Sequence, residues 1–195
     1  HRLSSAASDV YKRQTVFGPF GAVLDGPTDL LAVLGNHDVR DDHADAHAAA
    51  LGMPGRWYST DIEGVLIVAL DSNRPNDPAQ LAWLEATLGE STATWKLVIL
   101  HHPPFSGGFH GSSIDVRDAF GPLFEAHEVD LVFAGHDHDY QRSAPVNGVT
   151  YVVSGGAAKL RPAVLVDGME TAFSVHHFVD AVSYTHLTLP TRDDV

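Results

Sequence analysis

Short apolar runs alternate along the chain with stretches of helical spacing. Five runs have the length and the content of valine, isoleucine and leucine that are typical of buried strands: residues 30–34, 65–70, 97–100, 131–134 and 150–153. Helical spacing occurs in three stretches: residues 41–51, 78–88 and 116–127. Strands that alternate with helices predict an α/β layered sheet with helices on its outer faces. In this class, ligands bind beyond the carboxyl ends of the strands.

Three polar clusters begin where an apolar run stops. They are GNHD at 35–38, HHPP at 101–104 and GHDH at 135–138. Because the carboxyl ends of parallel strands meet at one edge of a sheet, we expect the side chains of these clusters to converge. Imidazole nitrogens and amide oxygens are ligands that suit zinc, iron or manganese. The sequence therefore predicts a metal site at this edge.

A single histidine after a strand is more often a hydrogen-bonded loop residue than a ligand, so the prediction depends on three clusters occurring together. His136 and His138 would be separated by about twice the 3.3 Å rise of an extended chain. That spacing lets each bind one ion of a pair held about 3.5–4 Å apart. Gly35 and Gly135 are expected to supply the backbone angles of tight turns. His43 and His47, four residues apart, are expected on an exposed helix face rather than at a metal.

These motifs resemble the later signature motifs of the calcineurin-like metallophosphoesterases. QLAWLEATL at 80–88, HGS at 110–112 and GHDHDYQRS at 135–143 are similar to the purple-acid-phosphatase-like branch of that family. Gln141 departs from the branch, which has a glutamate there, so a charge pairing at this position is not carried over. The resemblance implies an α/β fold, a layered metallophosphoesterase-type β-sandwich flanked by helices, with its first strands missing.

The resemblance also implies a set of metal ligands. Asn36, His101 and His136 would bind one ion, and His138 would bind the other. His101 is preferred to His102 because the first histidine after the strand matches the family ligand. The implied cofactors are two divalent or mixed-valence ions of zinc, manganese or iron.

Other matching residues would act on the substrate. His37 would protonate the leaving oxygen or stabilise the charged phosphoryl group, and Asp38 would orient His37. His102 would lie at the substrate side of the site. For His110 two interpretations stay open, a place in the substrate pocket and a role in forming its glycine-rich loop.

One part of the family pattern is absent upstream. Family members begin with Asp-x-His and Gly-Asp motifs, whose second aspartate bridges the two metals. Neither motif precedes Gly35, and Asp25 and Asp29 do not follow a suitable strand and glycine. Three neutral donors lack the anionic charge that hard cations favour, so we expect this chain to bind metal poorly by itself.

The two ends of the chain are expected to be non-native. Residues 4–14 and 182–191 can be encoded by one short DNA read in opposite orientations, and that DNA resembles a transposon adapter used in sequencing libraries. We therefore expect three segments: 1–14 derived from the adapter, 15–181 as a partial metallophosphoesterase domain, and 182–195 derived from the adapter.

The composition of the chain limits the kinds of molecule that it is expected to bind. A chain of 195 residues fits one domain, and its net charge of −13 disfavours long nucleic acids. With no cysteine it has no disulfide or thiolate zinc site. No apolar run is long enough to span a bilayer. A small phosphoester is the expected partner; no partner protein and no compartment follow from the sequence.

The sequence thus predicts a metal-dependent hydrolase of phosphate esters, a phosphatase or phosphodiesterase. It would use a dinuclear site and metal-bound hydroxide, in a parent protein of which this chain is an incomplete and inactive piece. Two alternatives stay open. The chain is a non-catalytic truncated module, or the parent is a nucleotide or cyclic-nucleotide phosphodiesterase.

Overall fold

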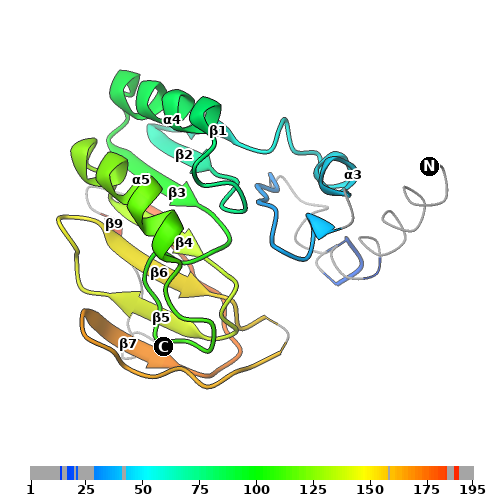
Figure 1. Ribbon diagram of the computed structural model, residues 1–195, viewed down its shortest axis with the longest axis vertical. Helices are drawn as coiled ribbons and strands as arrows, with labels where there is room; N and C mark the ends of the chain where they lie inside the picture. The colour runs from blue at the N-terminus through cyan, green and yellow to red at the C-terminus, as the bar shows by residue number, and fades with distance from the viewer. Residues whose placement is uncertain are drawn as a thin grey trace.

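Seven strands form one mixed sheet in the computed structural model, which describes residues 14, 17–19, 21, 29–40, 43–157, 159–183 and 187–188. The strands are β1 Tyr58–Ile62, β2 Val65–Ala69, β3 Trp95–Ile99, β4 Leu131–Ala134, β5 Tyr140–Ser143, β6 Thr150–Ser154 and β7 Met169–Phe173. Their order is β1-β2-β3-β4-β6-β5-β7 (Figure 1). The four strands β2, β3, β4 and β6 run parallel, and antiparallel strands complete both sides. A short pair, β8 Val182–Ser183 and β9 Leu187–Thr188, lies outside this sheet.

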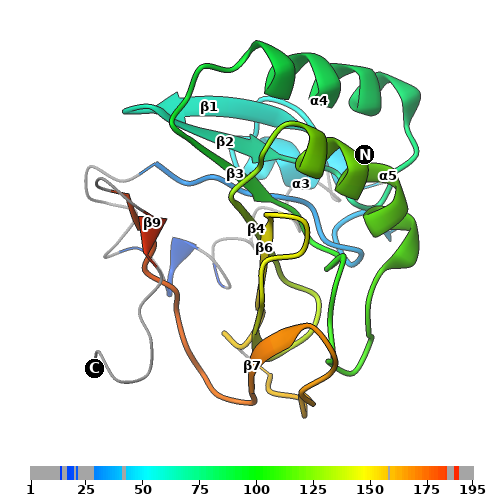
Figure 2. The same cartoon turned by 90° about the vertical axis from the view of Figure 1, so that its left-hand side faces the viewer.

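Two long helices cover one face of the sheet, and a third helix stands apart. Helix α4 spans Pro78–Glu90 and α5 spans Ile114–Ala126, both on the same side of the strands (Figure 2). The short helix α3, Ala44–Ala50, lies away from them (Figure 1). This arrangement confirms the predicted α/β class. No helix in the described part of the chain combines the length and apolar character of a membrane span.

The larger of two buried apolar clusters among the described residues lies between the sheet and the two long helices. Alternate strand residues such as Val68, Val98 and Val132 are fully buried, as period-two alternation requires. They belong to one cluster with Leu84 of α4 and Phe120 of α5. Removing such side chains from water contributes about 1.5–3 kcal/mol each. This burial fixes the register of β3 against β4 and thereby the residues that follow them.

The backbone ladder between β3 and β4 continues past both strands. Leu100 N donates to Phe133 O at 3.0 Å, and Gly135 N donates to His101 O at 3.1 Å. The two strand-end turns are therefore joined where their polar motifs begin. This pairing brings His101 and His136 to the same edge of the sheet, as predicted.

The prediction of a strand at residues 30–34 is wrong. The described residues of this stretch form no ladder, because side chains bind the backbone groups that a neighbouring strand would otherwise pair. The hydroxyl of Tyr58 donates to Ala32 O and accepts from Ala32 N, both at 2.8 Å. Asn73 Nδ2 donates to Leu34 O at 2.9 Å. Leu34 itself is fully buried.

The other predicted elements exist, most of them with shifted ends, and three strands of the seven-stranded sheet were missed. β1 and β5 have polar sequences, YSTDI and YQRS, and β7 reads METAF, so no apolar run marks them. The predicted helix 41–51 is observed from Ala44, and residues 41 and 42 lie outside the described residues, as does Asp25. The predicted adapter segments also fall mostly outside them.

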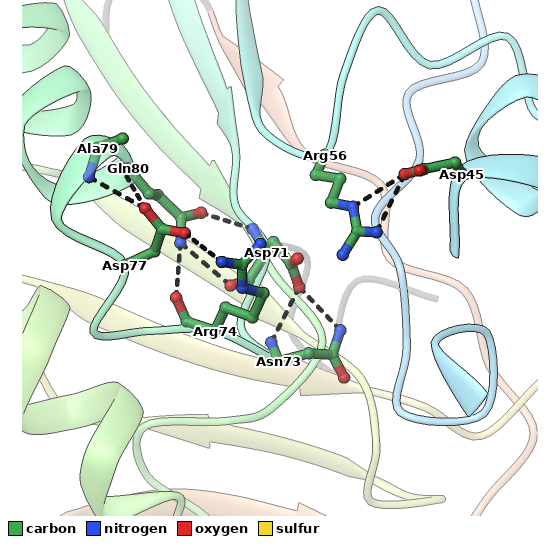
Figure 3. Close-up of polar contacts among 8 residues, drawn as sticks. All are labelled: Asp45, Arg56, Asp71, Asn73, Arg74, Asp77, Ala79 and Gln80. Carbon is green, nitrogen blue, oxygen red and sulfur yellow. Dashed lines mark hydrogen bonds and ion pairs between the residues drawn. The ribbon is translucent and has the colours of Figure 1, made fainter. Parts of the chain in front are cut away.

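A turn after β2 is held by the start of α4. Asp77 accepts hydrogen bonds from Ala79 N at 3.0 Å and Gln80 N at 3.4 Å, which caps the helix. The fully buried Gln80 accepts from Asp71 N at 2.8 Å and donates to Asp71 O at 3.2 Å (Figure 3). Its Nε2 also donates to Arg74 O at 3.1 Å. The turn that carries Ser72 is thereby fixed relative to the sheet.

Candidate metal centre

Side chains from three separate motifs meet at His101, and two of these motifs follow strands β3 and β4. His101 Nε2 lies 3.0 Å from Asn36 Oδ1 and 3.1 Å from His136 Nδ1. Three ring nitrogens lie within 4.8 Å of one another, one each from His101, His102 and His136. The convergence predicted for Asn36, His101 and His136 is therefore present in the structure.

Gly35 is required by the close approach of this imidazole. A Cβ atom at Gly35 would lie 2.8 Å from His101 Cε1 and 3.0 Å from its Nδ1. At Gly135 the nearest atom is His101 Nδ1 at 3.8 Å, an ordinary contact. The left-handed conformation falls instead on His136, with φ of 65°. Our expectation that the two glycines provide unusual turn angles was wrong, since one provides space and a histidine adopts the unusual angle.

The backbone that carries the histidine pair is held by Ser72. Ser72 Oγ accepts hydrogen bonds from His101 N at 3.2 Å and His102 N at 2.9 Å. The same oxygen lies 3.0 Å from His102 Nδ1. Sequence reasoning missed Ser72, although it follows the buried run of β2 as the predicted ligands follow theirs. The strand-end rule applied to β2 would have found it.

The turn that carries Asn36 is closed by Asp38. Asp38 N donates to Gly35 O at 3.0 Å, and Asp38 Oδ2 accepts from Gly35 N at 3.0 Å. Asp38 Oδ1 lies 3.3 Å from His47 Nδ1, and the His47 side chain is only 15% exposed. The exposed helix face expected for His47 was therefore wrong. His37 is exposed at the same turn, next to Asn36.

Electrostatics favour neutral imidazoles at this centre. Burial lowers the pKa of His101 to about 3, and the neighbouring His102 and His136 add to the shift. Burial likewise lowers the pKa of His136 to about 4 and also lowers the pKa of His102. Neutral imidazoles present nitrogen lone pairs, as metal ligands must. Two such nitrogens and the amide oxygen of Asn36 face one another, and a cation would satisfy all three. The donors present thus fit a zinc, manganese or iron ion.

His138 and His110 flank this group. In the described part of the chain, His138 Nδ1 is buried without a hydrogen-bond partner, and His138 is outside the three-histidine group. The ring of His110 lies over that of His136, with centroids 4.3 Å apart. His110 N donates to Asp137 Oδ1 at 2.8 Å. His138 therefore offers a donor atom apart from the first group, and His110 lies at the side of that group.

Comparisons with known proteins identify the family of this chain. Residues 9–140 match the family model described as calcineurin-like phosphoesterase. Purple acid phosphatase 3 of Arabidopsis thaliana is 32% identical, over 66% of this chain and 43% of that protein. The chain therefore spans less than half the length of this relative.

Solved structures show the same fold. A purple acid phosphatase from yellow lupin seeds has a TM-score of 0.65 at 18% identity, over 76% of this chain and 32% of that chain. A dimetal phosphatase from Danio rerio has a TM-score of 0.56 at 18% identity, over 90% of this chain and 78% of that chain. The family model covers more than half of the residues, including the motifs around Asn36, His101 and His136. The chain belongs to the calcineurin-like phosphoesterase family.

Proposed function

We propose that the parent protein hydrolyses phosphate esters at a dinuclear metal centre to which this chain contributes Asn36, His101, His136 and His138. The observation that carries the proposal is the 3.0–3.1 Å convergence of Asn36 Oδ1 and His136 Nδ1 on His101 Nε2. Family membership supports the reaction class, because relatives of this chain are named acid phosphatases. His138 would hold the second ion through its buried, unpartnered Nδ1 in the described structure.

When bound, the two ions would activate a water as the nucleophile and neutralise charge on the phosphoryl oxygens. Residues of this chain would hold the ligands of the ions in position before the ions bind. Gly35 leaves room for the His101 ring, and Ser72 holds the backbone of His101 and His102. Such preorganisation means that few side chains must reorder when the ions and the substrate bind.

The substrate would meet three further histidines. His37, exposed beside Asn36, would donate a proton to the leaving oxygen, and Asp38 would orient the turn that carries it. His102 and His110 would contact the phosphoester, because both rings lie against His136, at centroid distances of 4.7 and 4.3 Å. A phosphatase and a nucleotide phosphodiesterase share these roles and differ in whether the substrate is a phosphate monoester or a diester.

The chain by itself would be inactive. Among the described residues, the group that could hold a metal contains three imidazoles and no carboxylate. A bridging carboxylate would balance the charge of two cations, and hard ions in particular favour such anionic oxygen ligands. We propose that the parent protein adds this ligand, which also gives residues 15–181 the character of a partial domain.

The test is hydrolysis by the parent protein and by its His101→Ala and Asn36→Ala variants. We expect the parent to hydrolyse para-nitrophenyl phosphate after loading with Zn²⁺ or Mn²⁺, and both variants to lose at least a hundredfold in kcat/KM, as loss of a ligand implies. Turnover of bis-para-nitrophenyl phosphate without monoester turnover would favour the phosphodiesterase. A parent protein that hydrolyses neither substrate with any of these metals contradicts the proposal.

A further inference from the structure

A buried polar cluster lies next to the turn that carries His136 and His138. It contains Ser106, Asp137, Asp139 and Gln141, of which the last three are fully buried and Ser106 is 7% exposed. Buried polar groups are costly unless they are paired, so a connected network of them specifies one arrangement of the segments that it joins. The cluster joins strand β5 and the turn before it to the loop of residues 105–112.

Gln141 uses both ends of its amide in this network. Its Oε1 accepts a hydrogen bond from Gly107 N at 2.6 Å. Its Nε2 donates to Ser106 Oγ at 2.9 Å and to Asp139 Oδ1 at 2.8 Å. One side chain therefore binds two residues of the loop and one residue of the turn before β5. An ionised glutamate has no donor for Ser106 Oγ or Asp139 Oδ1.

Asp137 completes the connection to His110. Asp137 Oδ2 accepts from Ser106 Oγ at 2.5 Å, and Asp137 Oδ1 accepts from His110 N at 2.8 Å. The fit leaves no room for larger residues. A Cβ atom at Gly108 would lie 2.4 Å from Asp137 Cγ, and one at Gly155 would lie 2.0 Å from Asp137 O.

We propose that Gln141 is a positioning residue, which holds the loop that carries His110 against the turn that carries His136. Through Ser106 and Asp137, this contact sets the two rings 4.3 Å apart. The inference rests on the proposed function, in which His110 contacts the substrate. It adds that a neutral amide at position 141, rather than a carboxylate, keeps that contact in place.

The test uses histidine ring protons in NMR spectra of the metal-free chain. We expect Gln141→Glu to abolish the nuclear Overhauser contact between the His110 and His136 rings and to preserve the contact between His101 and His136, whose centroids lie 5.0 Å apart. Arg142→Ala is the matched control on β5, since Arg142 Nη2 binds Glu170 Oε2 at 3.4 Å outside the network. The control keeps both contacts.

Ser106→Ala is the second variant, because it removes one oxygen of the network without adding charge. It keeps the test decisive if Gln141→Glu does not fold, which the dispersion of core methyl signals reports. We expect it too to lose the contact between His110 and His136. A folded Gln141→Glu or Ser106→Ala chain that keeps this contact overturns the inference.

A kinetic measurement on the parent protein separates the inference from the proposed function. Gln141→Glu should raise KM about tenfold, and in a His110→Ala background it should add little, as residues acting through one another are not additive. Equal effects in the two backgrounds contradict the positioning role. If the NMR contacts change as expected and the parent shows no hydrolysis, the structural coupling stands while the proposed function fails.

Discussion

At the scale of single residues, the site depends on the space that Gly35 leaves for His101. Gly35→Ala would place a Cβ atom 2.8 Å from His101 Cε1, so the ring or the turn of Gly35 must shift. Overpacking of this kind costs about 1–3 kcal/mol. We expect at least a tenfold loss of Zn²⁺ affinity in the parent protein, measured by calorimetric titration. Gly135→Ala is the control, because its Cβ atom would meet His101 Nδ1 at 3.8 Å. Equal affinities for the two variants would contradict the steric explanation.

His136 offers a test of backbone conformation at the same site. Its φ of 65° lies in the left-handed region, which costs an L-residue about 1–2 kcal/mol and a glycine far less. Both His136→Gly and His136→Ala remove the imidazole. We expect the glycine variant to have the higher free energy of unfolding, by about 1 kcal/mol, in urea denaturation. An alanine variant of equal or greater stability would mean that the left-handed conformation is not retained.

The residues that sequence could predict are those that follow an apolar run. Asn36, His101 and His136 were found in this way, and the structure brings them together. Ser72 follows β2 in the same manner but carries no metal-binding side chain, so no motif marked it. The reason for Gly35 could not be predicted, because it depends on a ring that lies 66 positions further along the chain.

At the scale of elements, helix α4 supports the site from outside it. Asp77 caps the helix through Ala79 N, and Gln80 then holds the turn of Asp71 that precedes Ser72. Asp77→Ala should lower the free energy of unfolding by about 1 kcal/mol, the usual effect of losing an N-cap. Asp77→Asn keeps an oxygen acceptor, so its free energy of unfolding in urea denaturation should stay close to that of the unsubstituted chain. A loss as large for asparagine as for alanine would assign the effect to the charge pair with Arg74 instead.

Strands could be predicted from the sequence where a continuous apolar run marks them. β2, β3, β4 and β6 are central strands with apolar runs, and each was predicted with ends shifted by no more than two residues. β1 and β7 lie at the edges of the sheet, where one side of the strand has no neighbour among the described strands, and their sequences are more polar. The stretch at 30–34 has a strand-like composition, but Tyr58 and Asn73 bind its backbone.

At the scale of the whole molecule, the net charge of −13 governs what approaches the site. Such a charge repels polyanions at long range and repels a small phosphoester much less, since that substrate carries only one or two charges. We expect no retention of a 30-base-pair DNA duplex by the chain in a gel-shift experiment at about 0.15 M salt. Retention that weakens as the salt concentration rises would contradict this view of the surface.

The central claim is that Asn36, His101 and His136 hold one ion of a two-metal centre. The most direct measurement is the metal content per chain by mass spectrometry, for residues 15–181 and for the parent protein, each with its His101→Ala variant. The account predicts about two ions per parent chain, fewer in the variant, and little metal in residues 15–181. A parent protein that binds no metal, or that binds it equally well after His101→Ala, would contradict the account.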